Sequence, residues 1–257
     1  MKVRFYLLGT ILVLTSILAI RMFTMNVQAD QVIMVDVMYF IPDKSEFILD
    51  DEKRKNAVDE VIKKTNGNVW DIFEDKNALG GTALGAPGDN DFGTNFPLVY
   101  KLPVAIKAGE GGPWKMWARL NRTADPNSFW WKASQNASKW TPPGFNIDTH
   151  GWNNPGAPLN IPDKPPWFWF DGIGNPDFKP GDNYLMLSNR ESGVPPNVNL
   201  IDVISIRNDG KKPSDEEAEK LLAEQYKGIR SPFEKVEESV SPGGKLTTTW
   251  GRLKGEY

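Results

Sequence analysis

The chain has 257 residues, of which 40 % are hydrophobic and 25 % are charged, a composition typical of a packed globular protein. It contains no cysteine and a single histidine, His150, which excludes disulfide bonds, cysteine nucleophiles and zinc sites built from several histidines. The formal net charge is −3 and no basic stretch is dense enough to neutralise a phosphate backbone, so we expect no nucleic-acid partner.

Residues 1–29 have the three parts of a secretory signal peptide. Lys2 and Arg4 precede an apolar run over 5–20, and small residues at 27–29 offer a cleavage site. We therefore expect a secreted or periplasmic protein, whose net charge becomes −6 because cleavage removes three basic residues and no acidic one. The alternative is a retained membrane anchor, although 16 apolar residues give only about 24 Å of helix against a hydrocarbon core of roughly 30 Å.

The segment after the signal peptide begins with a strand and a helix. Asp30–Ile41 is rich in Val, Ile, Met and aromatic residues, which predicts the first strand. Acidic residues open 49–65, lysines close it, and its apolar residues share one face, which predicts a helix inserted between strands. Further short strands, separated by turn residues, are expected over 99–104, 114–120, 128–132, 184–188 and 200–207.

This spacing of strands predicts an all-β fold, a β-sandwich, over residues 30–210. Glycine and proline make up about 17 % of the chain, against a usual level of roughly 12 %, which also favours many turns. The stretch 140–166 is dense in Pro, Gly and Asn without a period, which is typical of a functional or mobile connection.

Residues 211–257 are expected to form a C-terminal extension that is helical at first and then polar. Ser214 and Glu217 form a capping-box pattern, which predicts a helix with Leu221 and Tyr226 on its apolar face. The tail from Ser231 is polar and Gly-rich. This segment is the candidate docking site for a protein partner.

Three segments carry a family resemblance. VYKLPVAIKAGEGGPWKMWARL at 99–120 is similar to two facing strands, PPWFWFDG at 165–172 to an aromatic strand, and 180–209 to a closing hairpin. In this order they resemble galactose-binding-like jelly-roll domains, in particular carbohydrate-binding module families six and thirty-five. The resemblance covers roughly 32–209 and implies a jelly-roll β-sandwich, to which the helix at 49–65 is an addition.

The resemblance also implies a structural Ca²⁺ ion. In these families an acidic residue of the first strand and one of the last help to hold calcium, and here these positions match Asp36 and Asp202. Carboxylate and backbone carbonyl oxygens are the ligands that calcium prefers. The alternative is that both carboxylates lie in turns or pair with arginines. Asp75 and Asp209 are weaker candidates for the same role.

Tryptophan is the most informative residue type, since eight of the ten tryptophans lie between Trp114 and Trp169. Indole rings stack on the apolar faces of sugars, while neighbouring amides and guanidinium groups bind the hydroxyls. Trp70 and Trp117 are expected in the core. The candidate ligand-binding residues are Trp131, Trp140, Trp152, Asn189 and Arg190.

Arg190 has a second interpretation, because Arg190 and Glu191 occupy a predicted hairpin turn that faces the strand of Arg119. An arginine–carboxylate fork would pin that hairpin. His150 is expected in a solvated loop. No serine has the context of a nucleophile, so we expect no catalytic residue.

Together these features predict an exported, noncatalytic, lectin-like module that binds a glycan or polysaccharide, with a membrane contact only if residues 1–29 are retained. The first alternative is a structural or protein-interaction module that keeps the fold without binding sugar. The second is a glycan hydrolase or lyase on the same scaffold.

Overall fold

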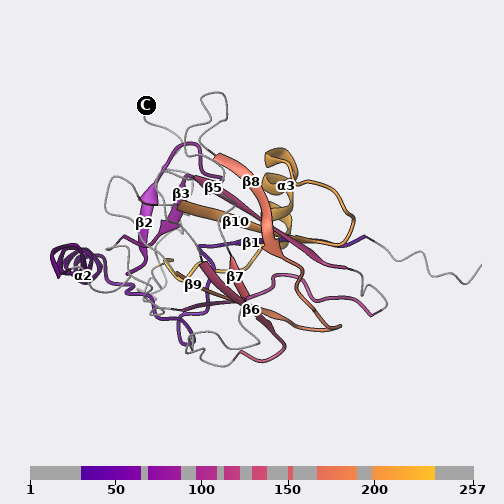
Figure 1. Cartoon of the computed structure of the whole chain (residues 1–257), viewed down its shortest axis with the longest axis horizontal. Helices are drawn as coiled ribbons and strands as arrows, with labels where there is room; N and C mark the ends of the chain where they lie inside the picture. The colour runs from indigo at the N-terminus through magenta and orange to yellow at the C-terminus, as the bar shows by residue number, and fades with distance from the viewer. Residues whose placement is uncertain are drawn as a thin grey trace, which may run out of the picture.

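The computed structural model describes residues 30–64, 69–87, 97–108, 113–121, 129–137, 150–152, 167–189, 198 and 200–234. This part of the chain is a sandwich of two antiparallel β-sheets with two helices, so the expected all-β sandwich is confirmed (Figure 1). Residues 1–29, which are predicted to be a signal peptide, and residues 235–257 of the polar tail lie outside the described residues. None of the described helices is long and apolar enough to cross a membrane.

The larger sheet has six strands, in the order β2-β3-β10-β5-β8, with β1 beside β10. Its central strand is β10, which pairs with β5 along one edge and with β3 and then β1 along the other. All residues of β10 are buried. The bounds are β1 (Val32–Asp36), β2 (Asp71–Glu74), β3 (Thr82–Gly85), β5 (Lys115–Asn121), β8 (Trp167–Gly174) and β10 (Leu200–Arg207).

The smaller sheet has four strands, in the order β4-β9-β6-β7. Its bounds are β4 (Leu98–Lys101), β6 (Phe129–Ser134), β7 (His150–Trp152) and β9 (Tyr184–Asn189). The expectation of a loop around His150 is wrong for the backbone, since this residue begins β7 and pairs with Trp131. Pairing with β6, rather than any periodicity in the Pro- and Gly-rich sequence, makes this three-residue strand.

The main hydrophobic core lies between the two sheets. Strand alternation points Met116 and Ala118 of β5 and Ile204 and Ile206 of β10 into it. Trp70 is 1 % exposed, which confirms its predicted core position.

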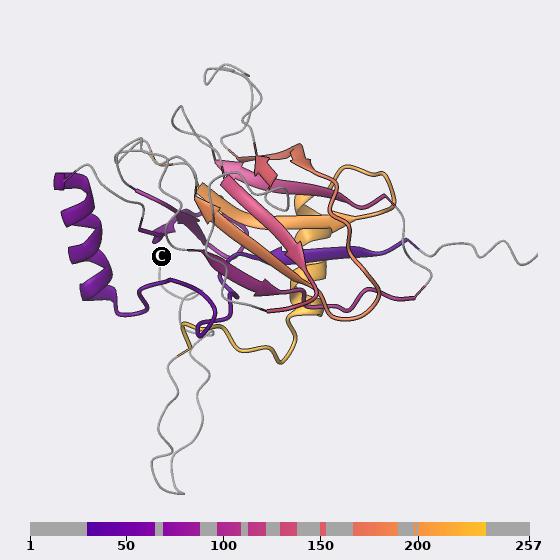
Figure 2. The ribbon, with the colours of Figure 1, turned by 60° about the horizontal axis from the view of Figure 1, so that its bottom comes forward.

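Helix α3 (Asp215–Gln225) covers the outer face of the larger sheet as a third layer, and Figure 2 shows it behind the strands. Its buried Ala218 packs on a second apolar cluster that includes Trp117 and Trp169, so the predicted core position of Trp117 is confirmed. The predicted cap is confirmed as well, because the Ser214 hydroxyl accepts from the backbone N–H of Glu217. Helix α2 (Asp51–Lys64) stands beside β2 (Figure 1).

One end of the sandwich, here called the crossing end, is where the chain passes between the sheets after β3, β5, β7 and β9. Leu200 lies opposite both Gly85 and Asn121, so β3 and β5 end where β10 begins. On the smaller sheet, β7 and β9 end where β6 begins. Trp70, directly before β2, stacks on Phe129 at the start of β6 with 5.9 Å between ring centroids, which brings both sets of strand ends together.

Candidate functional site

The crossing end carries two of the candidate ligand-binding residues. Trp152 is the last residue of β7 and Asn189 the last of β9, and both lie opposite Phe129. Two positions 37 residues apart in the chain are therefore placed on either side of the first residue of β6. Arg190 follows directly, but it lies outside the described residues, as does Trp140, and their roles stay predictions.

The side chain of Trp131 does not lie on a surface where it could bind a ligand. Its side chain is only 2 % exposed and belongs to the core between the sheets. It packs so closely against β8 that a Cβ atom added to Gly174 would come within 2.8 Å of its ring. Because a stacking platform must present a ring face to solvent, the structure gives Trp131 a packing role in place of the predicted sugar contact.

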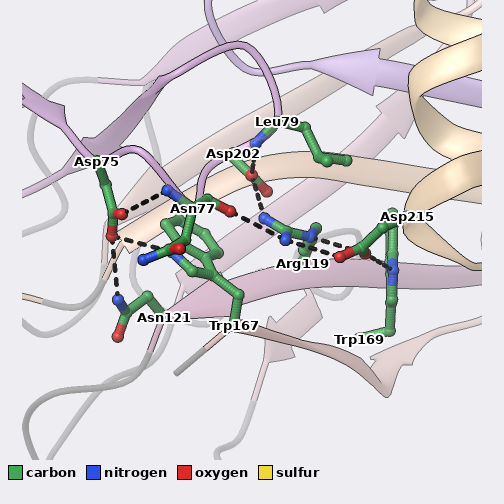
Figure 3. Close-up of polar contacts among 9 residues, drawn as sticks. All are labelled: Asp75, Asn77, Leu79, Arg119, Asn121, Trp167, Trp169, Asp202 and Asp215. Carbon is green, nitrogen blue, oxygen red and sulfur yellow. Dashed lines mark hydrogen bonds and ion pairs between the residues drawn. The ribbon is translucent and has the colours of Figure 1, made fainter. Parts of the chain in front are cut away.

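A polar cluster around Arg119 occupies the outer face of the larger sheet, beside the start of α3 (Figure 3). Arg119 Nη1 donates to Asp202 Oδ2 at 2.6 Å, while its Nε and Nη2 donate to the two oxygens of Asp215, each at 2.9 Å. Nη2 also donates to the carbonyl of Asn77 at 3.0 Å. One buried guanidinium thus joins β5, β10, the turn between β2 and β3, and α3.

Asp202 and Asp36 lie on the neighbouring strands β10 and β1, as the resemblance implied. Burial raises the pKa of Asp202 to about 7, against the opposing effects of Arg119 and of the Leu79 N–H bound to Oδ2. Burial raises the pKa of Asp36 to about 6, although its Oδ1 accepts from the Met38 N–H at 2.9 Å. The charge of Asp36 raises the pKa of Asp202 further, so the two carboxyls are close enough to interact.

For calcium, these two carboxyls are a partial ligand set. Asp202 Oδ1 is buried and has no hydrogen-bond partner in the described part of the chain, which is compatible with a further ligand. Its Oδ2 is already neutralised by Arg119. Over the described ranges, no three acidic or histidine side chains gather to hold a metal, so backbone carbonyls would have to complete a shell of six to eight oxygens. Calcium at Asp36 and Asp202 stays a prediction.

The weaker metal candidates have other partners. Asp75 accepts from the indole of Trp167 at 2.9 Å, and despite some desolvation its hydrogen bonds hold its pKa below the usual value. Asp209 forms a fork with Arg207, whose hydrogen bonds lower the pKa of this carboxyl.

Two tryptophans of β8 are held by the same cluster. The Arg119 guanidinium lies 5.0 Å from the centroid of the Trp167 ring, and Trp169 donates to Asp215 at 2.8 Å. They are 5 % and 9 % exposed. Trp169 therefore stabilises the contact between sheet and helix, Trp167 stabilises the turn between β2 and β3 through Asp75, and neither presents an open face for stacking.

The predicted fork at Arg190 and Glu191 lies outside the described residues, and within them Arg119 binds two other carboxylates. Its partners are Asp202 and Asp215. Two signals pointed there: a charged residue among the apolar residues of β5, and an acidic residue immediately after the Ser214 cap.

No family model matches the chain, and no curated protein matches it. Among solved structures, the chain is similar to a xanthan lyase of Paenibacillus, with 14 % identity and a TM-score of 0.31. The match covers 54 % of this chain and 11 % of the lyase, so the chain spans only a small part of that protein. A likeness of this size carries no argument, and kinship with galactose-binding-like domains stays a prediction.

Proposed function

We propose that this chain is an exported, noncatalytic carbohydrate-binding module of jelly-roll topology that binds its ligand at the crossing end. The observation that supports the proposal is the register of β6, which sets Trp152 and Asn189 on the two sides of Phe129. Tryptophan and asparagine are residue types that bind a sugar ring and its hydroxyls, and the backbone brings one of each to neighbouring strand ends.

The faces of the sandwich offer less room for a ligand than its end. Helix α3 covers the outer face of the larger sheet, where Trp117 and Trp169 are buried. On the outer face of the smaller sheet, Val99 and Met186 are buried against Ile41 and Tyr184. A ligand platform is therefore best sought among the residues at the crossing end.

The proposal of a noncatalytic module is supported by the ion pairs of two acidic side chains, the buried Asp202 and the half-exposed Asp215. A glycosidase needs one carboxylic acid and one carboxylate that both reach the substrate. Asp202 and Asp215 are instead bound by Arg119.

A glycan array probed with the purified chain, in calcium and in chelator, tests the function. We expect binding to a coherent set of glycans. Trp152→Ala should abolish binding with little change in melting temperature, while Trp152→Phe should retain part of it because a phenyl ring still stacks. Loss of binding in chelator would assign calcium a role in the site.

A blank array with a folded chain would overturn the sugar proposal and favour the protein-interaction module. Binding that is equal in Trp152→Ala and the unaltered chain would move the ligand away from the crossing end. Release of shortened sugars from a bound polysaccharide would identify a hydrolase or lyase.

A further inference from the structure

Strand β1 lies at an edge of the larger sheet, where it pairs only with β10 among the described strands. The end of α3 meets its other edge. Gln225 Nε2 donates to the carbonyl of Val32 at 2.9 Å, and the Met34 N–H donates to Gln225 Oε1 at 2.9 Å. The Asp36 N–H donates to the Tyr226 hydroxyl at 3.1 Å.

These contacts imitate a neighbouring strand. One residue of a parallel neighbouring strand donates to the C=O of one residue and accepts from the N–H two residues further on, and the Gln225 amide makes the same pair of bonds with Val32 and Met34. The Tyr226 hydroxyl continues the row at Asp36, whose carbonyl accepts from the Tyr39 N–H at 3.1 Å. Side chains thus bind the Val32 C=O, the Met34 N–H and the Asp36 N–H along the edge of β1.

The sequence of β1 is typical of a strand that pairs with another strand along its edge. Its sequence, Val-Ile-Met-Val-Asp, is rich in β-branched residues, and its first four residues carry no charge. Such an edge accepts a further strand unless something blocks it.

We propose that Gln225 and Tyr226 form an edge lock, and that β1 beneath it is a pairing site for β1 of a second copy of this chain. Antiparallel pairing about a two-fold axis at Met34 sets Val32 of each copy opposite Asp36 of the other. The two Asp36 carboxylates then do not face each other, so the pairing is self-complementary in charge and in hydrogen bonding.

The first turn of α3 has its own ion pairs with the sheet, separate from the bonds between the end of the helix and β1. Asp215 and Glu217, in the first turn, are bound by Arg119 and Arg207 of the sheet. The hydrogen bonds between the last turn and β1 come from Gln225, with Tyr226 just beyond it. Loss of the Gln225 bonds leaves the Met34 N–H and the Val32 C=O without these partners while the first turn stays anchored.

Sedimentation of the purified chain over a concentration series tests the edge lock. We expect Gln225→Ala to lower the dissociation constant of a dimer at least tenfold relative to the unaltered chain. Gln225→Glu should not, because its carboxylate still accepts from the Met34 N–H and places like charges at the pairing edge. Glu224→Ala, which alters the exposed neighbouring residue, is the matched control and should leave self-association unchanged.

A single introduced cysteine identifies the pairing register, since the chain has none of its own. In the Gln225→Ala background, Met34→Cys should give a disulfide-linked dimer on mild oxidation, because residues opposite each other in a hydrogen-bonded pair lie about 5.5 Å apart. Val32→Cys should not, because its two copies would lie four residues, or about 14 Å, apart along the strand.

The proposal is overturned if folded Gln225→Ala self-associates no more strongly than the unaltered chain, or if Val32→Cys crosslinks as well as Met34→Cys. Should Gln225→Ala fail to fold, Tyr226→Phe serves in its place, because it removes one edge bond and keeps the ring that packs on Tyr39. Its failure to strengthen self-association would then refute the edge lock.

Discussion

Replacing Arg119 with methionine tests whether the cluster on the outer face stabilises the fold. The side chain of Arg119 is 5 % exposed and that of Asp202 is fully buried. Methionine keeps most of the buried volume but leaves the Asp202 carboxylate without its cation. Removing one partner of a buried ion pair costs about 3–5 kcal/mol. The contact with Asp215 adds less than about 1 kcal/mol, because that carboxylate is half exposed.

A double variant distinguishes the cost of leaving Asp202 without its cation from the cost of altered packing at residue 119. Asp202→Asn keeps an oxygen for the Leu79 N–H and removes the stranded charge. We therefore expect Arg119→Met with Asp202→Asn to regain about 2 kcal/mol or more over Arg119→Met alone. Urea unfolding followed by tryptophan fluorescence measures both differences.

The pH dependence of the single variant gives an independent readout. The pKa of Asp202 is raised to about 7 even beside Arg119, so removing the cation raises it further. The folded variant then binds a proton that the unfolded chain does not, and its stability increases as the pH falls from 8 towards 5. A loss below about 1 kcal/mol at pH 8, or a double variant no more stable than the single one, would refute the reasoning.

Three further predictions follow from the same structure. Burial raises the pKa of Asp36 to about 6, so Asp36→Asn should be more stable than the unaltered chain at pH 8, by up to about 3 kcal/mol, and the difference should vanish near pH 4; a pH-independent difference would contradict this. Gly174→Ala should cost more than about 2 kcal/mol in urea unfolding, because its Cβ would clash with Trp131, whereas Gly210→Ala, with open space around it, should cost only backbone strain of about 1 kcal/mol; equal costs would refute the clash. Calcium should raise the melting temperature relative to chelator in the unaltered chain and not in Asp36→Asn; identical melting curves would refute the metal prediction.

The sequence predicted the elements whose local pattern is strong. Alternation and flanking turn residues located β4, β5, β6, β9 and β10 within a few residues, and the Ser214 cap located the start of α3. The residues that resembled an aromatic strand do form β8. In each case the pattern is long enough to be distinguished from a loop.

The strands that were missed are the short ones. Asp71–Glu74, Thr82–Gly85 and His150–Trp152 have three or four residues each, too few to show a period. Asp71–Glu74 pairs with β3, which itself pairs with β10, and His150–Trp152 pairs with β6. A partner as far away in the chain as β10 is not visible in a local pattern. The role of α3 as a third layer depends in the same way on the sheet it covers.

The predictions for single site residues also depended on contacts that are not visible in the local sequence. Alternation could not say which face of β6 meets the core, and Trp131 proves to be buried in it. A charged residue in a buried strand must find a partner, yet the sequence does not identify that partner. Arg119 found it in Asp202 and Asp215, on elements that lie 83 and 96 residues further along the chain.

The central position of β10 determines when the fold can be completed. This strand is the last of those described to leave the ribosome, and β1, β3 and β5 all pair with it. Until residue 207 has emerged, β1 lacks its only strand partner among the described strands. Contacts between residues this far apart close large loops, which slows folding. A growing chain therefore carries an unfinished sheet through most of its synthesis, and its larger sheet can be completed only late.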